Sequence, residues 1–239
     1  MQQVKFKDLG IIDYKAAWDY QEMLLNENVL IKSNARKLDA GYDVKTLSTQ
    51  HYFLLCEHQP VYTLGKSGNI NNLLLSEEEM SDKKISFFKT NRGGDITFHG
   101  LQQIVGYPIL DLEKIYTDIG RYLRELEEVI ILTLANYGIK GERSAGETGV
   151  WIDAGIAGKE RKICAIGVRC SRWITMHGFA LNVNTDLDYF KNIIPCGIQN
   201  KQVTSIMQEI GTAVDYEEVK ETIKKNFGKM FNLILEQAD

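Results

Sequence analysis

The sequence predicts an α+β fold in which helices flank a mixed or antiparallel sheet. Short strand-like runs outnumber the segments with a helical period, and several of these runs follow one another with no helix between them. The 239 residues, 44% of them hydrophobic, are enough to form a sizeable core. We therefore expect a single domain over residues 1–239, in which about 200–239 form a small C-terminal helical subdomain.

Three segments carry the apolar period of an amphipathic helix. The first follows Asp13, a suitable N-cap, and covers Tyr14 to about Ile31. The second runs from about Thr117 to Tyr137 and stops at Gly138, and the third covers Asp215 to Leu235. We interpret all three as structural helices.

The strand-like runs lie between these helices. They are short, rich in β-branched and aromatic residues, and bounded by turn residues. The expected strands are Tyr52–Glu57, Val61–Leu64, Ile85–Phe88, Ile104–Leu110, Gly149–Ile152, Lys162–Val168 and Ile174–Val183.

The composition argues against several classes of protein. The net charge of −4 gives no global basic field for a nucleic acid. No run approaches the roughly 18 apolar residues of a membrane span, and the first ten residues lack the apolar core of a secretory signal. We expect a cytoplasmic protein with no membrane or nucleic-acid partner. Six basic residues form either a local basic rim for an acidic partner or merely scattered surface charge. They are Lys66, Arg92, Lys159, Arg161, Arg169 and Arg172.

The cysteines suit neither a disulfide scaffold nor a structural zinc site. Cys56, Cys164, Cys170 and Cys196 are few for a chain of this length, and none forms a Cys-x-x-Cys pair. We therefore expect no metal and no cofactor.

Cys196 has the most distinctive surroundings of the four. It lies between Pro195, which restricts the backbone, and Gly197, which permits a close approach. Either it is an inert packing residue, as buried cysteines often are, or it is a thiol held on a bend in order to react.

A glycine-rich segment at residues 92–100 is the densest group of functional residue types. Two adjacent glycines follow Arg92, and His99 stands near the end. Backbone amides and a guanidinium could here approach a ligand, although a solvated hairpin would look the same. The glycine spacing matches neither a dinucleotide fingerprint nor a Walker loop.

A lysine opens one of the predicted strands. In an extended strand, Lys162 shares a face with Cys164 and Ile166, at the start of an otherwise apolar run. It is either a solvated strand end or, if buried, a base with a lowered pKa. A further strand-like run contains a second His-Gly step, His177-Gly178.

Four segments in register, RGGDITFHG, KICAIGVR, HGFALNVNTDL and IIPCGI, resemble the octanoyltransferase family of lipoate biosynthesis. The resemblance covers most of the chain. It implies the fold of the catalytic domain of biotin and lipoate protein ligases. It also implies an enzyme that needs no cofactor and takes octanoyl from octanoyl-acyl carrier protein. The acceptors that it implies are lipoyl domains of 2-oxoacid dehydrogenases and the glycine cleavage H protein. Separately, we expect a monomer.

The resemblance assigns roles to individual residues. Cys196 is the nucleophile that carries the acyl group, and Lys162 activates its thiol. The implied substrate-binding residues are Arg92, Gly93, Gly94, Asp95, Ile96, Thr97, Phe98 and His99, with Ala165, Ile166, Gly167, Gly178, Phe179 and Ala180 lining the acyl pocket.

The chain departs from the family in one place. The family continues its first motif as His-Gly-Pro-Gly-Gln, whereas here Leu101 and Gln102 stand between Gly100 and Gln103. We expect a change in the stiffness of this loop without loss of the chemistry.

Three other functions remain open. An ATP-dependent lipoate or biotin protein ligase on the same scaffold would not need Cys196. A non-catalytic module that binds lipoyl domains or carrier protein would need neither Cys196 nor Lys162. A papain-like hydrolase would pair Cys196 with His99 or His177, but nothing in the sequence marks either histidine for that pairing.

Overall fold

The computed structural model describes residues 2–38, 41–194 and 202–238. Within these ranges the helices are α1 (Tyr14–Leu38), α2 (Glu77–Asp82), α3 (Ile119–Ala135), α4 (Ile206–Ile210) and α5 (Tyr216–Phe231). The strands are β1 (Gln2–Ile11), β2 (His51–Glu57), β3 (Val61–Leu64), β4 (Ser86–Lys89), β5 (Ile96–His99), β6 (Gln103–Ile109), β7 (Val150–Ile152), β8 (Arg161–Ser171), β9 (Ile174–Asn182), β10 (Gln202–Val203) and β11 (Leu233–Gln237).

The main sheet is mixed. In the described part of the chain its strands follow the order β10-β8-β9-β6-β2-β1-β11, and β7 also pairs with β8. The central pairs β2–β6, β6–β9 and β8–β9 are antiparallel. The outer pairs β1–β2, β1–β11 and β8–β10 are parallel. This arrangement confirms the predicted α+β fold.

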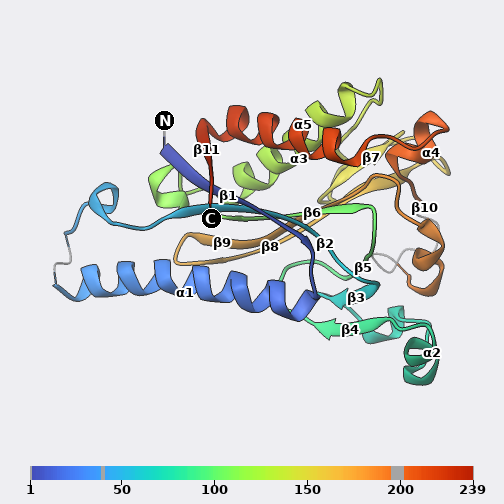
Figure 1. The fold of residues 1–239 in the computed structure, drawn as a ribbon, viewed down its shortest axis with the longest axis horizontal. Coiled ribbons are helices and arrows are strands. Elements are labelled where there is room, and N and C mark those ends of the chain that lie inside the picture. The colour runs from blue at the N-terminus through green and yellow to red at the C-terminus, as the bar shows by residue number, and fades with distance from the viewer. Residues whose placement is uncertain (1, 39–40, 195–201, 239) are drawn as a thin grey trace.

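Helices cover both faces of this sheet. In Figure 1, α1 lies below the strands, while α3 and α5 lie above them. The upper core joins α3 and α5 to Phe53, Phe179 and their neighbours, and Phe53 stacks on Phe227 of α5 with ring centroids 4.0 Å apart. The lower core packs Ala17, Leu24 and other α1 residues against β2, β6 and β9. Burying these apolar faces stabilises a three-layer arrangement.

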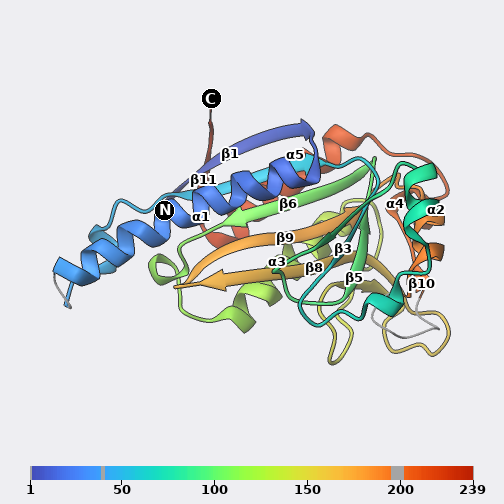
Figure 2. The same ribbon diagram turned by 90° about the horizontal axis from the view of Figure 1, so that it is seen from below.

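A smaller sheet, β4-β3-β5, lies beside one end of the main sheet (Figure 2). It has its own apolar cluster, in which Phe98 of β5 stacks on Tyr189 with ring centroids 4.6 Å apart. Because β5 follows the glycine-rich residues directly, this sheet fixes where the segment begins its approach to the main sheet.

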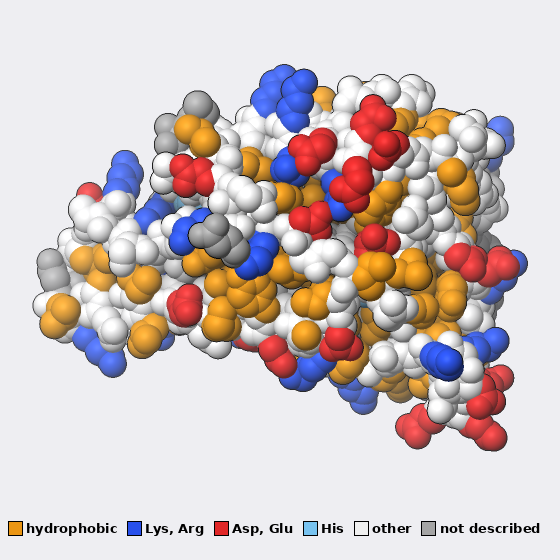
Figure 3. Space-filling view, in the orientation of Figure 1, with side chains coloured by type: hydrophobic (Ala, Val, Ile, Leu, Met, Phe, Trp, Pro, Cys, Tyr) orange, Lys and Arg blue, Asp and Glu red, His pale blue; other side chains and the backbone are white. Residues whose placement is uncertain are grey.

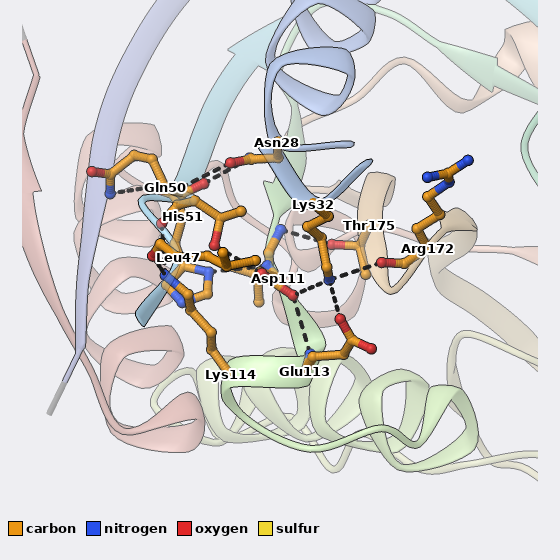
Figure 4. A network of polar contacts seen from close by, with 12 residues as sticks. Asn28, Lys32, Leu47, Gln50, His51, Asp111, Glu113, Lys114, Arg172 and Thr175 are labelled. Carbon is orange, nitrogen blue, oxygen red and sulfur yellow. Dashed lines mark hydrogen bonds and ion pairs between the residues drawn. The ribbon is translucent and has the colours of Figure 1, made fainter. Parts of the chain in front are cut away.

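A buried ion-pair network attaches the C-terminal part of α1 to the sheet (Figure 4). Lys32 Nζ lies 2.7 Å from Asp111 Oδ1 and 2.5 Å from Glu113 Oε2, and it donates to the carbonyl of Arg172. Thr49 donates to the second Asp111 oxygen. Every charge in this network therefore has a partner, which a buried charge requires.

The predicted strands are confirmed, each within a few residues of its expected bounds. The first helix is longer than predicted and reaches Leu38, and the second is confirmed as α3. The third was predicted to reach Leu235, which is wrong. Asn232 adopts the left-handed conformation and ends α5 at Phe231, and Leu235 lies in β11, paired with Val4.

Several elements were absent from the sequence prediction. β1 and β11 pair with each other across more than 200 positions, so no local pattern marks their partnership. The two-residue β10 is equally dependent on its partner β8. The short α2 does carry a local signal, because Ser76 and Glu79 form a capping box.

The C-terminal segment packs into the main core. Val219, Ile223 and Phe227 of α5 belong to the same apolar cluster as the α3 side chains, and β11 extends the main sheet. These residues therefore share one core with the central strands. The extent of the domain as a whole remains a prediction.

Candidate active site

A cavity of about 270 Å³ opens where the glycine-rich segment meets β8 and β9. Its size lies just below the roughly 300–1,000 Å³ of common ligand pockets, which suits one narrow ligand. Its walls come from segments that are far apart in the sequence. They include Tyr14, Arg92, Gly94, Asp95, Ile96, Thr97, His99, Gln103, Val105, Tyr107, Trp151, Lys162, Ala165, Ile166, Gly167, His177, Gly178, Phe179, Ala180, Asn182, Gln202 and Val203.

Arg92 is buried, and its side chain binds the small sheet. One guanidinium nitrogen, Nη2, donates to the carbonyl and hydroxyl oxygens of Thr63 at 2.6 and 2.8 Å. The other, Nη1, donates to the Gly93 carbonyl at 2.9 Å. These bonds fix the guanidinium at the cavity wall, where the residue is only 8% exposed.

Asp95 orients a neighbouring loop. One carboxylate oxygen, Oδ2, accepts a hydrogen bond from Asn72 at 2.7 Å, and the other accepts from the backbone of Asn69 and Ile96. The backbone of Asn72 in turn accepts a hydrogen bond from the amide of Ile194. Asp95 thus ties the glycine-rich segment to the chain just before residue 195.

Small residues of β8 and β9 face each other across the sheet beside the cavity. Ala165 pairs with Ala180, and Gly167 pairs with Gly178. A Cβ atom on Gly167 would lie 2.8 Å from the Gly93 carbonyl, and one on Gly178 would lie 2.1 Å from the Gly106 carbonyl. Glycine is required at both positions because a neighbouring backbone approaches closely.

Lys162 lies near the start of β8 and lines the cavity. Its Nζ lies 4.5 Å from the centroid of the Trp151 ring, within the range of a cation–π contact. The pairing of β7 with β8 shifts register between Val150 and Trp151, next to this lysine. Cys164, expected on the same face as Lys162, does not line the cavity but lies in the upper core.

Two histidines in the cavity wall are held neutral. Burial lowers the pKa of His99 well below its usual range, and the nearby His58 and Arg92 add to this effect. Burial and the charges of Arg92 and Arg169 lower the pKa of His177 to about 3. Each ring is held by neutral partners: His99 by Gln103 and Thr63, and His177 by Asn91.

The structure brings most of the predicted substrate-binding residues together. All of them line the cavity except Gly93 and Phe98. Gly93 instead donates from its amide to Val168 at 2.9 Å, and Phe98 packs in the small sheet's apolar cluster. Cys196 lies outside the described residues.

The other cysteines have distinct surroundings. Cys164 and Cys56 are fully buried, and burial raises the pKa of both thiols well above the ordinary value. Cys170 is exposed. Cys164 is therefore an unreactive thiol within the core, despite its place beside Lys162 in the sequence.

Several cavity residues were not predicted as site residues, among them Tyr14, Gln103, Tyr107 and Asn182. Tyr14 begins α1, Tyr107 and Gln103 belong to β6, and Asn182 ends β9. Tyr14 and Tyr107 fitted an apolar pattern and were assigned to structural elements. Asn182 stands inside the quoted HGFALNVNTDL segment, which was the only sequence signal for it.

Three members of the expected basic rim make contacts within the fold, and the choice between a rim and scattered charge stays a prediction. Arg92 is buried, Arg161 pairs with Asp153 and Glu209, and Arg169 pairs with Glu22. On the face shown in Figure 3, acidic side chains gather over α5, where Glu217 and Glu221 also form ion pairs with lysines. Lys66, Lys159 and Arg172 are exposed.

The described residues hold neither a metal-binding cluster nor a membrane-spanning helix. They contain no group of three or more histidine, cysteine or acidic side chains placed to hold a metal ion. In the same ranges, no helix combines the length and the apolar character needed to cross a membrane.

Residues 13–228 match the family model of the lipoyl protein ligase A/B catalytic domain. The chain is 56% identical to the octanoyltransferase of Christiangramia forsetii over 231 residues, which cover 96% of both chains. It is 58% identical to the octanoyltransferase of Flavobacterium psychrophilum over 230 residues, or 96% of this chain and 97% of that one.

Solved structures share the fold at low sequence identity. A bipartite lipoate protein ligase from Thermoplasma acidophilum superposes with a TM-score of 0.67 at 16% identity, over 100% of this chain and 87% of that chain. A lipoate-protein ligase A bound with ATP gives a TM-score of 0.69 at 13% identity, over 99% and 88%. These similarities establish the fold alone. The family model and the relatives at 56% and 58% identity show that the chain belongs to the octanoyltransferases, a family of acyltransferases with the lipoyl protein ligase A/B catalytic domain.

Proposed function

We propose that this chain transfers an octanoyl group from octanoyl-acyl carrier protein to a lysine of a lipoyl domain, through a thioester on Cys196. The observation that carries the proposal is the shared cavity. Residues of three of the four family motifs line it: the Arg92 segment, Lys162 with Ala165–Gly167, and Gly178–Ala180. The fourth motif contains Cys196, and Gln202 and Val203, shortly after it, also line the cavity.

The first half-reaction forms the acyl-enzyme. Lys162 takes the proton of the Cys196 thiol, and the thiolate attacks the thioester carbonyl of the octanoyl carrier. The bond between carbon and the carrier sulfur breaks, and the carrier thiolate leaves with the proton that Lys162 held. One thioester replaces another, so the protein contributes mainly orientation and stabilisation of the oxyanion.

The second half-reaction forms the amide. The ε-amine of the acceptor lysine attacks the acyl-Cys196 carbonyl, the carbon–sulfur bond breaks, and the Cys196 thiolate regains a proton. Thioester aminolysis is downhill, so the proposed reaction requires no nucleotide. The Gly93 amide already donates to the Val168 carbonyl, so this amide is not available to stabilise the oxyanion.

Burial of the acyl chain in the cavity contributes favourable binding free energy. Burying an eight-carbon chain contributes on the order of 5 kcal/mol at ~0.8 kcal/mol for each methylene. The small residues of β8 and β9 leave room for it, while Tyr14 and Tyr107 contribute larger side chains to the wall. The cavity therefore suits a medium-length chain.

The test measures intact mass after the protein is mixed with octanoyl carrier protein. We expect the wild-type chain and Cys164→Ser to gain one octanoyl group, Cys196→Ser to gain none, and Lys162→Ala to react much more slowly. An adduct that persists in Cys196→Ser and disappears in Cys164→Ser would contradict the proposal.

The same reaction distinguishes the alternatives. Transfer that requires ATP and free octanoate would favour a ligase. Tight binding of the carrier with no turnover would favour a non-catalytic module. Release of free octanoate in place of transfer to a lipoyl domain would favour a hydrolase.

A further inference from the structure

A chain of hydrogen bonds begins at the cavity arginine. Arg92 Nη2 donates to the hydroxyl oxygen of Thr63 at 2.8 Å. That oxygen lies 3.3 Å from His99 Nε2, and His99 Nδ1 lies 3.0 Å from Gln103 Oε1. Because the Gln103 oxygen can only accept and burial keeps His99 neutral, Nδ1 carries the proton and Nε2 accepts from Thr63.

The chain continues in the same direction to the strand of Lys162. Gln103 Nε2 donates to Asn182 Oδ1 at 2.8 Å, and Asn182 Nδ2 donates to the Thr204 carbonyl at 2.9 Å. The Thr204 amide then donates to the Lys162 carbonyl at 2.9 Å. Gln103, Asn182 and Thr204 are all buried. Consecutive bonds that point the same way polarise and strengthen one another.

Asn182 lies at the point where β9 ends and β10 continues the pairing along the same edge of β8. Cys164 pairs with both β7 and β9, so these two strands lie on opposite edges of β8. Lys162 pairs with both β7 and β10, so β10 shares its edge with β9. β9 ends at Asn182, and the side chain of Asn182 crosses to Thr204, just beyond β10.

β10 is too short to hold this position by its own pairing. It contributes only the register pairs Gln202–Arg161 and Val203–Lys162. Two side-chain links support it. Thr204 donates to Glu209, which pairs with Arg161, and Asn182 connects Thr204 to the cavity wall. Of these two links, the one through Asn182 leads back to Arg92.

We infer that Asn182, held in place by Gln103, is a positioning residue that sets where Lys162 lies relative to the cavity. This inference rests on the proposed function, in which Lys162 activates the thiol of Cys196. Loss of the Asn182 donor would leave the Thr204 carbonyl without this hydrogen bond and allow the Thr204 backbone, which binds the Lys162 carbonyl, to shift. A proton transfer between Lys162 and a thiol is sensitive to such a change.

The charged groups around Lys162 are held mainly by other charged side chains, although Glu209 also accepts from the Thr204 hydroxyl. Glu127 of α3 is held by Arg124, Arg143 and the Gly149 amide, and Arg161 of β8 is held by Asp153 and Glu209. Glu147 and Arg92 also line the cavity. Asn182→Asp would add one carboxylate to this set, so a variant without a new charge is needed beside it.

The experiment compares Asn182→Asp and Asn182→Ser with matched changes at Asn184. Asn184 is two residues further along and also donates from its amide, but to Gln102 and Val214. For each variant we would measure iodoacetamide labelling of the Cys196 peptide against pH and single-turnover acylation by octanoyl carrier protein. Melting temperature reports the purely structural effect.

We expect both Asn182 variants to raise the apparent pKa of the Cys196 thiol toward the ordinary ~8.5. They should slow acylation between about 10-fold and 100-fold, with the KM for the carrier unchanged. The Asn184 variants should keep the wild-type profile and rate at a similar loss of melting temperature. Gln103→Glu, which lets the Asn182 amide turn away from Thr204, should shift the profile in the same direction.

The outcomes separate the inference from the function on which it rests. If both Asn182 variants and Gln103→Glu keep the wild-type profile and acylation rate, Asn182 is merely structural and the inference is wrong. If Lys162→Ala also leaves the labelling profile of Cys196 unchanged, the proposed pairing of Lys162 with Cys196 is wrong instead.

Discussion

Two buried polar clusters lie along α1 and differ in how they hold charge. Near the start of the helix, Tyr14 lines the cavity beside the hydrogen-bond relay, the chain of side chains that runs from Arg92 through Thr63, His99 and Gln103 to Asn182. Near its end, Lys32 forms ion pairs with Asp111 and Glu113 (Figure 4). The two points are about 27 Å apart at ~1.5 Å per residue.

The difference lies in the members of each cluster. The Lys32 network pairs formal charges, whereas the relay connects one cation, Arg92, to the neutral side chains of Thr63, His99, Gln103 and Asn182. Removing one partner from the first leaves a buried charge, and removing one neutral link leaves only an unmet hydrogen bond. Damage to the first should therefore appear in stability, and damage to the second in catalysis.

The largest expected effect is that of Lys32→Met on stability. The change leaves the Asp111 carboxylate, which is fully buried, without its main cation. We expect the free energy of unfolding to fall by about 3–5 kcal/mol, measured by urea denaturation. Octanoyl transfer by the protein that remains folded at low temperature should be unchanged.

A control for this change is Lys15→Met in the same helix. The Lys15–Asp19 pair is exposed, so its loss should change the free energy of unfolding little. Two results would contradict the proposed difference between the clusters. One is an equal loss of unfolding free energy in Lys32→Met and Lys15→Met, and the other is a loss of octanoyl transfer by folded Lys32→Met.

A smaller loss of stability is expected from a substitution at Gly167, where the glycine-rich segment contacts β8. Gly167→Ala would place a Cβ 2.8 Å from the Gly93 carbonyl and 3.3 Å from Arg92 Cδ. We expect a loss of about 1–3 kcal/mol in unfolding free energy from this overpacking. The rate of octanoyl transfer by the folded variant should also fall, because the new Cβ forces Arg92 to move at the cavity wall.

Gly93→Ala is the matched change on the other side of this contact. Its Cβ would meet only the Val168 carbonyl, at 3.5 Å, an ordinary contact distance. Its unfolding free energy, measured in the same way, should stay close to that of the wild type. A larger destabilisation by Gly93→Ala than by Gly167→Ala would contradict the packing argument.

For one histidine over one pH unit, the smallest expected effect is a change in the pH dependence of stability. Burial lowers the pKa of His51, beside Asp111, to about 4, and lowers those of His58 and His177, near the cavity, to about 4 and 3. Below about 6.5 the unfolded chain binds protons that the folded chain does not. The free energy of unfolding should therefore fall as the pH drops from about 6.5 toward 4. The fall is about 1.4 kcal/mol per pH unit for each proton that the unfolded chain binds and the folded chain does not.

His51→Gln separates the contributions of the two regions. The slope of unfolding free energy against pH, between pH 6 and 5, should decrease by the contribution of about one proton. The contribution of the cavity histidines to this slope should remain. Denaturant titrations at several pH values would measure both slopes. An unchanged slope in His51→Gln, or a wild-type stability that does not fall toward pH 5, would be evidence against this assignment.

The sequence by itself determined the fold class, the central strands and the family. Periodicity located α1, α3 and most strands, because these patterns are local. The four motifs indicated octanoyltransferases, and the close relatives and the family model confirm that membership. Most of the expected substrate-binding residues line one cavity, while the roles of Cys196 and Lys162 remain proposals.

Only the tertiary structure decided how these residues depend on one another. The register of β10 against Lys162, the crossing of Asn182 to Thr204 and the approach of Gly93 to Gly167 all join distant segments. Burial, likewise, sets the protonation of His99 and turns Cys164 into an inert thiol. Sequence patterns report which face of an element is apolar. Long-range packing alone decides which polar group ends beside which, and therefore which hydrogen bond each one makes.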